Sequence, residues 1–290
     1  MNGPMWMYRH LPRVTHLWRR LARANYEREM ELLPGLCDPA RTGVDVGAKV
    51  GMYTYRIRDA SSDVVAFEPI PLFNNMLRAV FEGKRGHIEP VAVSAAPGKV
   101  TMRLPYDSKN EQQFGRATIE AANPLKADVV ARVEELEVET RTLDSYDWKS
   151  LGFIKVDVEG HELSVLAGAE QTIARHRPNL LIECNDDHAV DGTKRLAQWF
   201  ADHDYEVLFF DRDRLRPFAE YDRAVHWQQY FIENFIGVPR GDAERRRRLD
   251  AQAAIAAKTA RAPSRWPAQA AVSAAARCGP MIWASSRSGL

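Results

Sequence analysis

The stretch Val44-Asp-Val-Gly-Ala-Lys-Val-Gly51 decides the fold, because it has the pattern of a buried strand that ends in a glycine-containing turn. A helical pattern begins at about Met52, directly after the second glycine. Glycines in a strand-to-helix turn let the backbone bend tightly and approach a ligand closely. The spacing is D-x-G-x-x-x-G, so the G-x-G-x-x-G fingerprint of NAD-binding proteins is not met. The turn by itself therefore indicates an α/β protein and leaves the ligand open.

Short β-rich runs alternate with helical patterns from this turn onward. We expect strands at 43–46, 63–67, 88–93, 153–156, 179–184 and 205–210, and helices at 52–59, 72–81, 163–175 and 193–203. Strands that alternate with helices need crossover connections, which give a mostly parallel sheet covered on both faces.

Two further features complete the expected sheet. A seventh strand, 230–236, has no helix before it, and we expect it to run antiparallel at or near the sheet edge. The alternating runs 100–104 and 138–143 predict a small antiparallel β excursion, with a long irregular loop between them. Loops of that length inside compact domains are usually functional or disordered.

Charge is distributed unevenly along the 290 residues, although 40 basic side chains nearly balance 39 acidic ones. Residues 1–41 carry 7 basic and 4 acidic side chains, and residues 240–290 carry 10 and 3, so the middle of the chain is acidic. An acidic body repels phosphates, which argues against a nucleic-acid partner. We expect an N-terminal helical extension over 1–41, one folded domain over 42–240, and a basic, largely disordered Ala/Arg-rich tail over 241–290. The basic ends permit contact with a membrane surface.

The N-terminal extension carries an amphipathic helical pattern between residues 12 and 33. Its apolar residues recur at i, i+3, i+4 and i+7, and its other face is rich in arginine; the apolar set is Val14, Leu17, Trp18 and Leu21. The pattern favours a helix packed on the domain. The alternatives are a membrane-surface helix and a lid over a substrate site.

Cysteine content and targeting signals indicate the compartment. Cys37, Cys184 and Cys278 are widely spaced and form no C-x-x-C pair, which fits a reducing environment. Cys184 follows an apolar run and is expected to be buried. There is no apolar signal region and no run of about 18 apolar residues, so we expect a cytoplasmic protein.

Polar or glycine residues follow five successive strands, and the carboxyl ends of parallel strands meet at one edge of the sheet. Glu68 lies near the spacing from Gly51 at which an acidic side chain reaches ribose hydroxyls, and a surface glutamate before a turn is the alternative. We therefore predict a ligand cleft at this edge. The other strand-end residues are Ser94, Asp157, Glu159, Glu162, Glu183 and Asn185.

Several segments, in order, resemble the FkbM family of S-adenosylmethionine-dependent methyltransferases. They are Asp45-Val-Gly-Ala-x-x-Gly51, Ala66-Phe-Glu-Pro69, Thr142-Leu-Asp144, Ile154-Lys-Val-Asp-Val-Glu-Gly-x-Glu162, Val165-Leu-x-Gly-Ala169 and Pro178-x-Leu-Leu-Ile-Glu183. The resemblance covers about residues 42–237, and K-x-D-V-E-G-x-E is its most specific part. It implies a Rossmann-like class I methyltransferase fold and transfer of a methyl group to a hydroxyl of a sugar, glycan or secondary metabolite.

The resemblance also implies where the cofactor, S-adenosylmethionine, would bind. The glycine turn would border its amino-acid portion, the next strand end its ribose, the third strand end its adenine, and Asp157 its sulfonium methyl and the acceptor. The implied contacts are Asp45, Gly47, Ala48, Gly51, Glu68, Pro69, Val93, Ser94 and Asp157. Lys49 stands where the family usually has asparagine. We expect its side chain to point to solvent, away from the positive sulfonium, and a contact with the cofactor carboxylate is the alternative.

An alcohol is a poor nucleophile at neutral pH, so methyl transfer would be helped by a base or a metal. The catalytic candidates are Asp157, Glu159 and Glu183, with Asp157 first because it closes the central strand. Glu159, like Glu162, has the alternative role of capping the helix that follows. Asp157, Glu183 and Asn185 could offer oxygen ligands to Mg²⁺, which is the less favoured hypothesis.

The acceptor and the oligomeric state correspond to no motif. We expect the acceptor pocket to be built largely from residues 1–41 and 105–135. Two other function classes stay open at this point: a catalytically inactive cofactor-binding module with a protein-interaction role, and a nucleotide- or NAD-linked enzyme on the same sheet.

Overall fold

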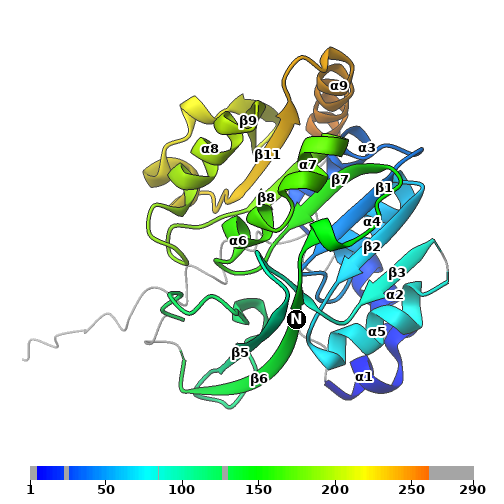
Figure 1. Ribbon diagram of the computed structural model, residues 1–290, viewed down its shortest axis with the longest axis vertical. Helices are drawn as coiled ribbons and strands as arrows, with labels where there is room; N and C mark the ends of the chain where they lie inside the picture. Colours follow the sequence, from blue (N-terminus) through cyan, green and yellow to red (C-terminus); the bar gives the residue numbers. More distant parts are fainter. Residues whose placement is uncertain (1–4, 23–25, 84, 126–129, 261–290) are drawn as a thin grey trace, which may run out of the picture.

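Eight strands form one sheet through the middle of the molecule in the computed structural model, which describes residues 5–22, 26–83, 85–125 and 130–260 (Figure 1). Their order is β10-β9-β11-β8-β7-β1-β2-β3, and the run from β8 to β3 is parallel. β1 lies between β2 and β7, with Val44 beside Val65 and Ile154. The strands are β1 (Thr42–Val46), β2 (Asp63–Phe67), β3 (Gly86–Glu89), β7 (Leu151–Val156), β8 (Asn179–Glu183), β9 (Tyr205–Asp211), β10 (Arg214–Pro217) and β11 (Asn234–Pro239).

The predicted Rossmann-like, mostly parallel sheet is confirmed, with eight strands where we expected seven. The last strand, β11, runs antiparallel as predicted but lies between β8 and β9, so its expected place at or near the edge is wrong. It pairs with β8 through residues 234–237 and with β9 through residues 235–239, and all six of its residues are buried. The edge position is held by β10, which pairs with β9 as an antiparallel hairpin.

A second sheet confirms the expected β excursion. β5 (Gly98–Tyr106) and β6 (Arg132–Arg141) pair antiparallel, with Val100 opposite Val138, and the two-residue β4 (Ala92–Val93) lies parallel to β6. The strand predicted at 88–93 is therefore divided between β3 of the main sheet and β4 of this one. Pro90 separates them, because proline has no N–H to donate to a strand ladder.

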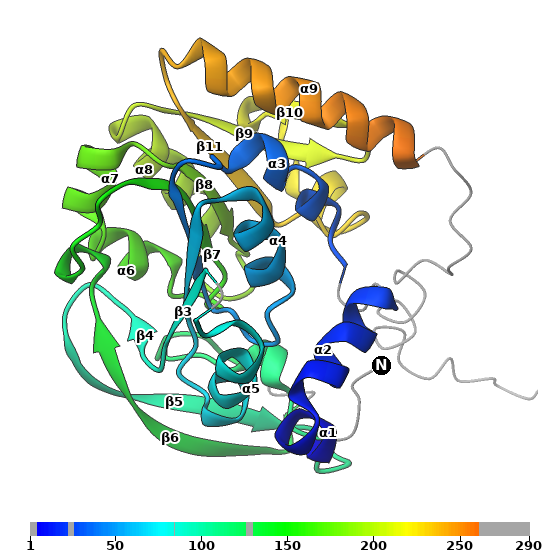
Figure 2. The ribbon, with the colours of Figure 1, turned by 90° about the vertical axis from the view of Figure 1, so that its right-hand side faces the viewer.

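Helices cover both faces of the main sheet (Figure 2). One face carries α3 (Leu33–Leu36), α4 (Met52–Ala60) and α5 (Pro71–Phe81), and the other carries α6 (Glu162–Ala167), α7 (Glu170–His176) and α8 (Gly192–Asp202). The helix predicted at 163–175 is interrupted between α6 and α7. The break lets Gly168 approach the Ser94 carbonyl and lets the Asp144 carboxylate accept from the first amides of α7.

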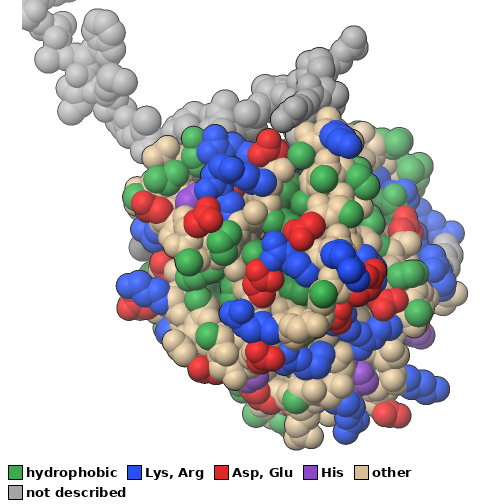
Figure 3. All heavy atoms as spheres, turned by 90° about the horizontal axis from the view of Figure 1, so that it is seen from above, with side chains coloured by type: hydrophobic (Ala, Val, Ile, Leu, Met, Phe, Trp, Pro, Cys, Tyr) green, Lys and Arg blue, Asp and Glu red, His purple; other side chains and the backbone are tan. Residues whose placement is uncertain are grey.

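The predicted disordered tail is wrong for residues 243–260, which form α9 (Ala243–Ala260). Leu249, Ala253 and Ala256 are buried where α9 packs against α3 and β10. Its arginines are engaged within the molecule: Arg246 pairs with Glu206, and Arg248 donates to the Cys37 carbonyl. Figure 3 shows this end of the molecule, where Lys and Arg side chains are interspersed with Asp and Glu side chains. The rest of the predicted tail, 261–290, lies outside the described residues.

The N-terminal extension forms α1 (Met5–His10), α2 (Pro12–Leu21) and the short 3-10 helix η1 (Arg28–Glu31). The predicted helix is therefore shorter than its pattern, and its apolar residues face outward instead of packing on the domain. Within the described residues, no helix combines the length and the apolar character needed to span a bilayer. Cys37 and Cys184 are both buried and unpaired, as expected for Cys184, and Cys278 lies outside the described residues.

Candidate active site

The carboxyl ends of β1, β2 and β7 open into a cavity. Its floor is the glycine turn after β1 and the ends of β2 and β7. Its other walls come from the second sheet and from the loop around η2 (Phe114–Arg116). The cavity therefore lies where the strand-end residues predicted a cleft, and the long loop predicted at 105–135 supplies one of its walls.

Gly47 brings the turn after β1 against the end of β7. Its φ is 82°, and a Cβ at this position would lie 1.9 Å from the carbonyl oxygen of Asp157. Any larger residue would push the two strand ends apart. Gly47 lines the cavity and its amide donates to the Phe67 carbonyl, so the turn is held on both sides.

Lys49 points into the cavity, so the expectation that it points to solvent is wrong. It lines the cavity wall, and its ammonium lies 2.8 Å from the point where a Cβ on Gly115 would be. The positive charge lowers the pKa of Asp157 and opposes the rise in the pKa of Glu159. Its φ is 49°, a left-handed conformation that asparagine adopts more readily than lysine.

Glu68 is buried and its carboxylate holds the turn in place. One oxygen accepts from the amide of Lys49 at 2.7 Å, and the other accepts from the amide of Ile70 at 2.8 Å. Burial raises the pKa of Glu68 to about 7, against the effect of these two hydrogen bonds. The same carboxylate lines the cavity, where its remaining lone pairs can accept from hydroxyl donors. The structure thus excludes the surface-glutamate alternative.

Lys155 and Asp157 form a buried ion pair at the end of β7. Lys155 is almost fully buried, and its ammonium donates to Asp157 Oδ2 at 2.7 Å and lies 4.5 Å from the centre of the Tyr53 ring. Burial raises the pKa of Asp157, but the lysine outweighs it and holds that pKa below its ordinary value. Asp157 is therefore ionised at neutral pH.

Three carboxylates meet beside this ion pair. Asp157, Glu159 and Glu183 each place an oxygen within 4.8 Å of the others, a spacing that a divalent cation would fit. Burial and the charge of Asp157 raise the pKa values of Glu159 and Glu183 well above their ordinary range. Glu183 in turn contributes to the lowered pKa of Asp157, so the ionisation of the two carboxyl groups is linked.

Glu159 has a backbone that the surrounding loop constrains. Its φ is 56°, and its carbonyl accepts from Thr118 Oγ1 at 2.9 Å and from Asn123 Nδ2 at 2.7 Å. Its carboxylate lies 3.4 Å from His188 Nδ1 and lines the cavity. The loop above the cavity therefore fixes the position of this acidic side chain.

Two further glutamates, which the sequence did not single out, face the same cluster. Glu27 precedes η1 and accepts from Tyr53 Oη at 2.8 Å, and Glu233 accepts from Asn185 Nδ2 at 2.9 Å. Burial raises the pKa of both, that of Glu233 to about 8. They come from the N-terminal extension and from the segment before β11, and no local motif connects them to β7.

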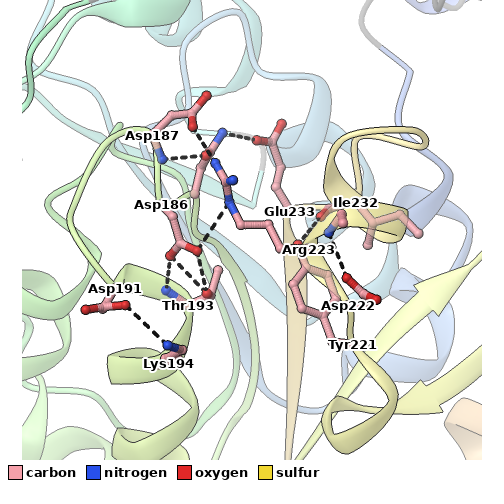
Figure 4. Close-up of polar contacts among 12 residues, drawn as sticks. Asp186, Asp187, Asp191, Thr193, Lys194, Tyr221, Asp222, Arg223, Ile232 and Glu233 are labelled. Carbon is pink, nitrogen blue, oxygen red and sulfur yellow. Dashed lines mark hydrogen bonds and ion pairs between the residues drawn. The ribbon is translucent and has the colours of Figure 1, made fainter.

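The segment that carries Glu233 is held by a polar network after β8 (Figure 4). Arg223 donates to Asp187 Oδ1 at 2.6 Å and lies 3.4 Å from Asp186, whose carboxylate also accepts from Thr193 at the start of α8. Asn185 is a buried member of this network, since its amide faces Glu233 and its oxygen accepts from the amide of Asp187. Asn185 is therefore engaged, and the three-carboxylate group contains Glu159 in its place.

Some of the remaining predicted residues line the cavity and others do not. Pro69 and Val93 line it, whereas Ala48, Gly51 and Ser94 lie behind its wall. Ser94 Oγ is hydrogen-bonded to His161 Nε2 at 2.9 Å, and His161 in turn contacts Glu120. Gly51 begins α4 with a φ of 78°, and a Cβ there would meet Leu77 and Phe81.

Two predicted acidic residues have identifiable contacts away from the cavity surface. Asp45 is fully buried behind the turn: one carboxylate oxygen accepts from Thr54 Oγ1 at 2.6 Å, and the other has no hydrogen-bond partner among the described residues. Glu162 accepts from the amide of Gly160 at 2.9 Å, and burial raises its pKa to about 7. Glu162 thus holds the turn that precedes α6, and its hydrogen bond is to that turn and not to an amide of the helix itself.

One residue that we did not assign had a signal in the sequence. Lys155 lies in Phe153-Ile-Lys-Val, a run otherwise typical of a strand buried on both faces. A buried lysine needs carboxylate partners, so its position alone pointed to an acidic cluster nearby.

Known proteins resemble this chain in sequence and in fold. The methyltransferase FkbM domain matches residues 45–207, more than half of the chain. No curated protein matches. The fold is similar to that of a methyltransferase FkbM from Methylobacillus flagellatus KT, with a TM-score of 0.44 and 19% identity over 69% of this chain and 44% of that chain. This chain therefore spans less than half the length of that protein. It is also similar to a TehB-like SAM-dependent methyltransferase from Corynebacterium glutamicum ATCC 13032, with a TM-score of 0.38 and 14% identity over 79% and 96% of the two chains.

Proposed function

The chain belongs to the FkbM methyltransferase family, and on this basis we propose that it transfers a methyl group from S-adenosylmethionine to a hydroxyl oxygen. The favoured acceptor is a sugar or glycan, and a hydroxyl of a secondary metabolite is the second choice. The observation that carries the proposal is that Glu68 and two carboxylates of the acidic cluster, Asp157 and Glu159, line one cavity. A cofactor site and a group of proton acceptors thus adjoin each other.

The residues of the cavity fit S-adenosylmethionine. Gly47 lines the cavity and keeps the turn close against Asp157, and the Glu68 carboxylate has lone pairs available for ribose hydroxyls. Val93 and Phe67 offer apolar walls for a base, and Lys49 offers a cation for the cofactor carboxylate. When bound, the cofactor supplies an electrophilic methyl group on a sulfonium.

The Asp157–Glu183 pair would act as the base. One carboxylate of the pair is ionised at neutral pH, and a hydroxyl placed against it can give up its proton as the oxygen attacks. Lys155 holds the pair in place, and Glu159, which lines the cavity beside the pair, would orient the acceptor through another hydroxyl. Because each carboxylate oxygen accepts hydrogen bonds, a polyhydroxylated acceptor such as a sugar suits this wall.

The experiment combines binding with product analysis. Calorimetry with S-adenosylhomocysteine tests the cofactor site, and mass spectrometry of glycans and metabolites from a deletion strain tests for a product that has lost one CH₂ increment. We expect Asp157→Asn to lower turnover by roughly 10²- to 10⁴-fold, because an amide cannot take up the proton of the acceptor hydroxyl. Asp213→Asn, exposed and outside the cavity wall, is the matched control.

The outcomes separate the alternatives. Binding of S-adenosylhomocysteine with no product in any fraction would favour the inactive module, and binding of NAD in its place would refute the proposal. A divalent cation on Asp157, Glu159 and Glu183 would make activity sensitive to EDTA, whereas the carboxylate pair predicts full activity in excess EDTA.

A further inference from the structure

The apolar face of the N-terminal helices points away from the molecule. Figure 2 shows α1 and α2 on the outer side of α5. The exposed fractions are 54% for Val14, 52% for Leu17 and 77% for Leu21, which repeat along one side of α2. We call the full exposed set the N-terminal stripe: Trp6, Leu11, Val14, Leu17, Trp18 and Leu21. Contiguous apolar exposure of this kind marks an interaction surface.

The opposite side of α2 fixes this orientation. His16 is buried, its Nε2 donates to the Gly51 carbonyl at 3.3 Å, and its ring meets the Phe81 ring edge-on at 5.1 Å. Arg19 is buried too and donates to Tyr8 Oη at 2.5 Å. Turning the helix to bury the N-terminal stripe would break these contacts and expose the rings beneath. The stripe is therefore held outward by the fold.

The charges beside the N-terminal stripe indicate the kind of surface that it contacts. No acidic side chain occurs before Glu27, and Arg9 and Arg13 are exposed beside the stripe. Arg20 lies 3.5 Å from the centre of the Tyr55 ring. Two copies of the chain meeting through this face would bring their arginines together, so charge disfavours a self-interface. A stripe of leucine and tryptophan flanked by arginine is the pattern of a helix that lies in an anionic membrane interface.

We propose that α1 and α2 bind the surface of an anionic lipid bilayer, with the N-terminal stripe at the level of the headgroups. Aromatic contacts connect α1 to the cavity. The ring centroids of Tyr8 and Phe73 lie 6.1 Å apart, and those of Phe73 and Phe114, a residue of the cavity wall, lie 4.6 Å apart. Binding through this surface would hold the cavity next to the membrane. That the cavity then acts at the membrane rests on the proposed methyl transfer.

The test is sedimentation of the full chain with vesicles of equal parts phosphatidylcholine and phosphatidylglycerol, against phosphatidylcholine alone. We expect binding to the anionic vesicles that weakens with added salt. Leu17→Glu should lower the partition coefficient about tenfold or more, because it puts a charge in the stripe. Ile255→Glu on α9 is the matched control, since Ile255 is 54% exposed and lies outside the stripe.

The controls distinguish a membrane contact from a folding defect and from self-association. Equal thermal unfolding and equal S-adenosylhomocysteine binding show that Leu17→Glu is folded, so failure here is distinct from failure of the proposed function. Brominated lipids should quench tryptophan fluorescence, and a Trp6→Phe, Trp18→Phe double variant should lose that quenching. Any one of three results would overturn the proposal. The first is quenching that depends on Trp266 and Trp283 instead, and the second is equal binding by Leu17→Glu and Ile255→Glu. The third is a dimer that Leu17→Glu dissociates in the absence of lipid.

Discussion

Replacing Glu68 with glutamine tests the cofactor site most directly. The carboxylate accepts from two backbone amides, at 2.7 Å from Lys49 and 2.8 Å from Ile70. A glutamine has only one acceptor oxygen, so its NH₂ group would face one of these two backbone N–H groups. That buried N–H would then have no acceptor. This costs about 1–3 kcal/mol of folding free energy. The substitution is isosteric, so we expect a folded protein with a lower melting temperature.

The loss in cofactor affinity follows from the same geometry. Hydrogen bonds from hydroxyls to a carboxylate contribute about 1.5–3 kcal/mol each, and about 1.4 kcal/mol corresponds to a tenfold change in Kd. We expect Glu68→Gln to weaken S-adenosylhomocysteine binding by roughly 10- to 100-fold. The assay is isothermal titration calorimetry above pH 7, because the pKa of Glu68 is about 7 and the carboxylate is ionised there.

The control for this prediction is a second glutamate at a neighbouring strand end. Glu89 closes β3, accepts from Tyr146 Oη at 3.2 Å and lies outside the cavity wall. Glu89→Gln should leave the Kd unchanged. A Kd for Glu68→Gln within about twofold of the original, in a protein shown by calorimetry to be folded, would mean that Glu68 only supports the turn.

Two further predictions concern charge in and around the cavity. Lys49→Asn should raise the free energy of unfolding by up to about 1 kcal/mol, since asparagine tolerates a φ of 49° better. It should also move the acid limb of the kcat/KM profile to higher pH, because the pKa of Asp157 rises without the nearby ammonium. Lys194→Asn, on the surface, should change neither the stability nor the pH profile. An acid limb that Lys49→Asn does not move would count against Asp157 as part of the base. The free energy of unfolding should increase by a few kcal/mol as the pH falls from about 8 to 5, because buried glutamates keep protons that the unfolded chain has lost. Urea denaturation across this pH range measures the free energy of unfolding. A stability that is constant or that rises with pH would contradict the prediction. The glutamates are Glu29, Glu68 and Glu162, whose pKa values burial raises to about 7, and Glu233, raised to about 8.

Much of the fold could be predicted from local sequence, because strands buried on both faces read as continuous apolar runs. The run at Val64–Phe67 and the run at Leu180–Ile182 show this, and both lie in the parallel part of the sheet. Strand ends were equally readable, since a glycine or a carboxylate after an apolar run marks the edge where parallel strands meet. Glu68, Asp157 and Glu159 were located in this way.

The N-terminal helix shows where a local pattern misleads. The apolar periodicity of α2 correctly indicated a helix, but it predicted the wrong buried face. Burial depends on which partners the neighbouring elements offer, and here Gly51 and Phe81 offer a carbonyl and a ring edge to His16. Likewise, the run of arginines in α9 indicated a solvated tail, whereas Leu249 and nearby alanines are buried against α3.

The sequence by itself determined the order of strands and helices, the glycine turn and the acidic side chains at the strand ends, because these depend on neighbours within a few residues. Only the tertiary structure decided that Lys49 points inward, that Lys155 neutralises Asp157, and that Glu27 and Glu233 join the cluster. These contacts link residues that lie far apart along the chain. Their energies depend on burial and distance, and packing sets both.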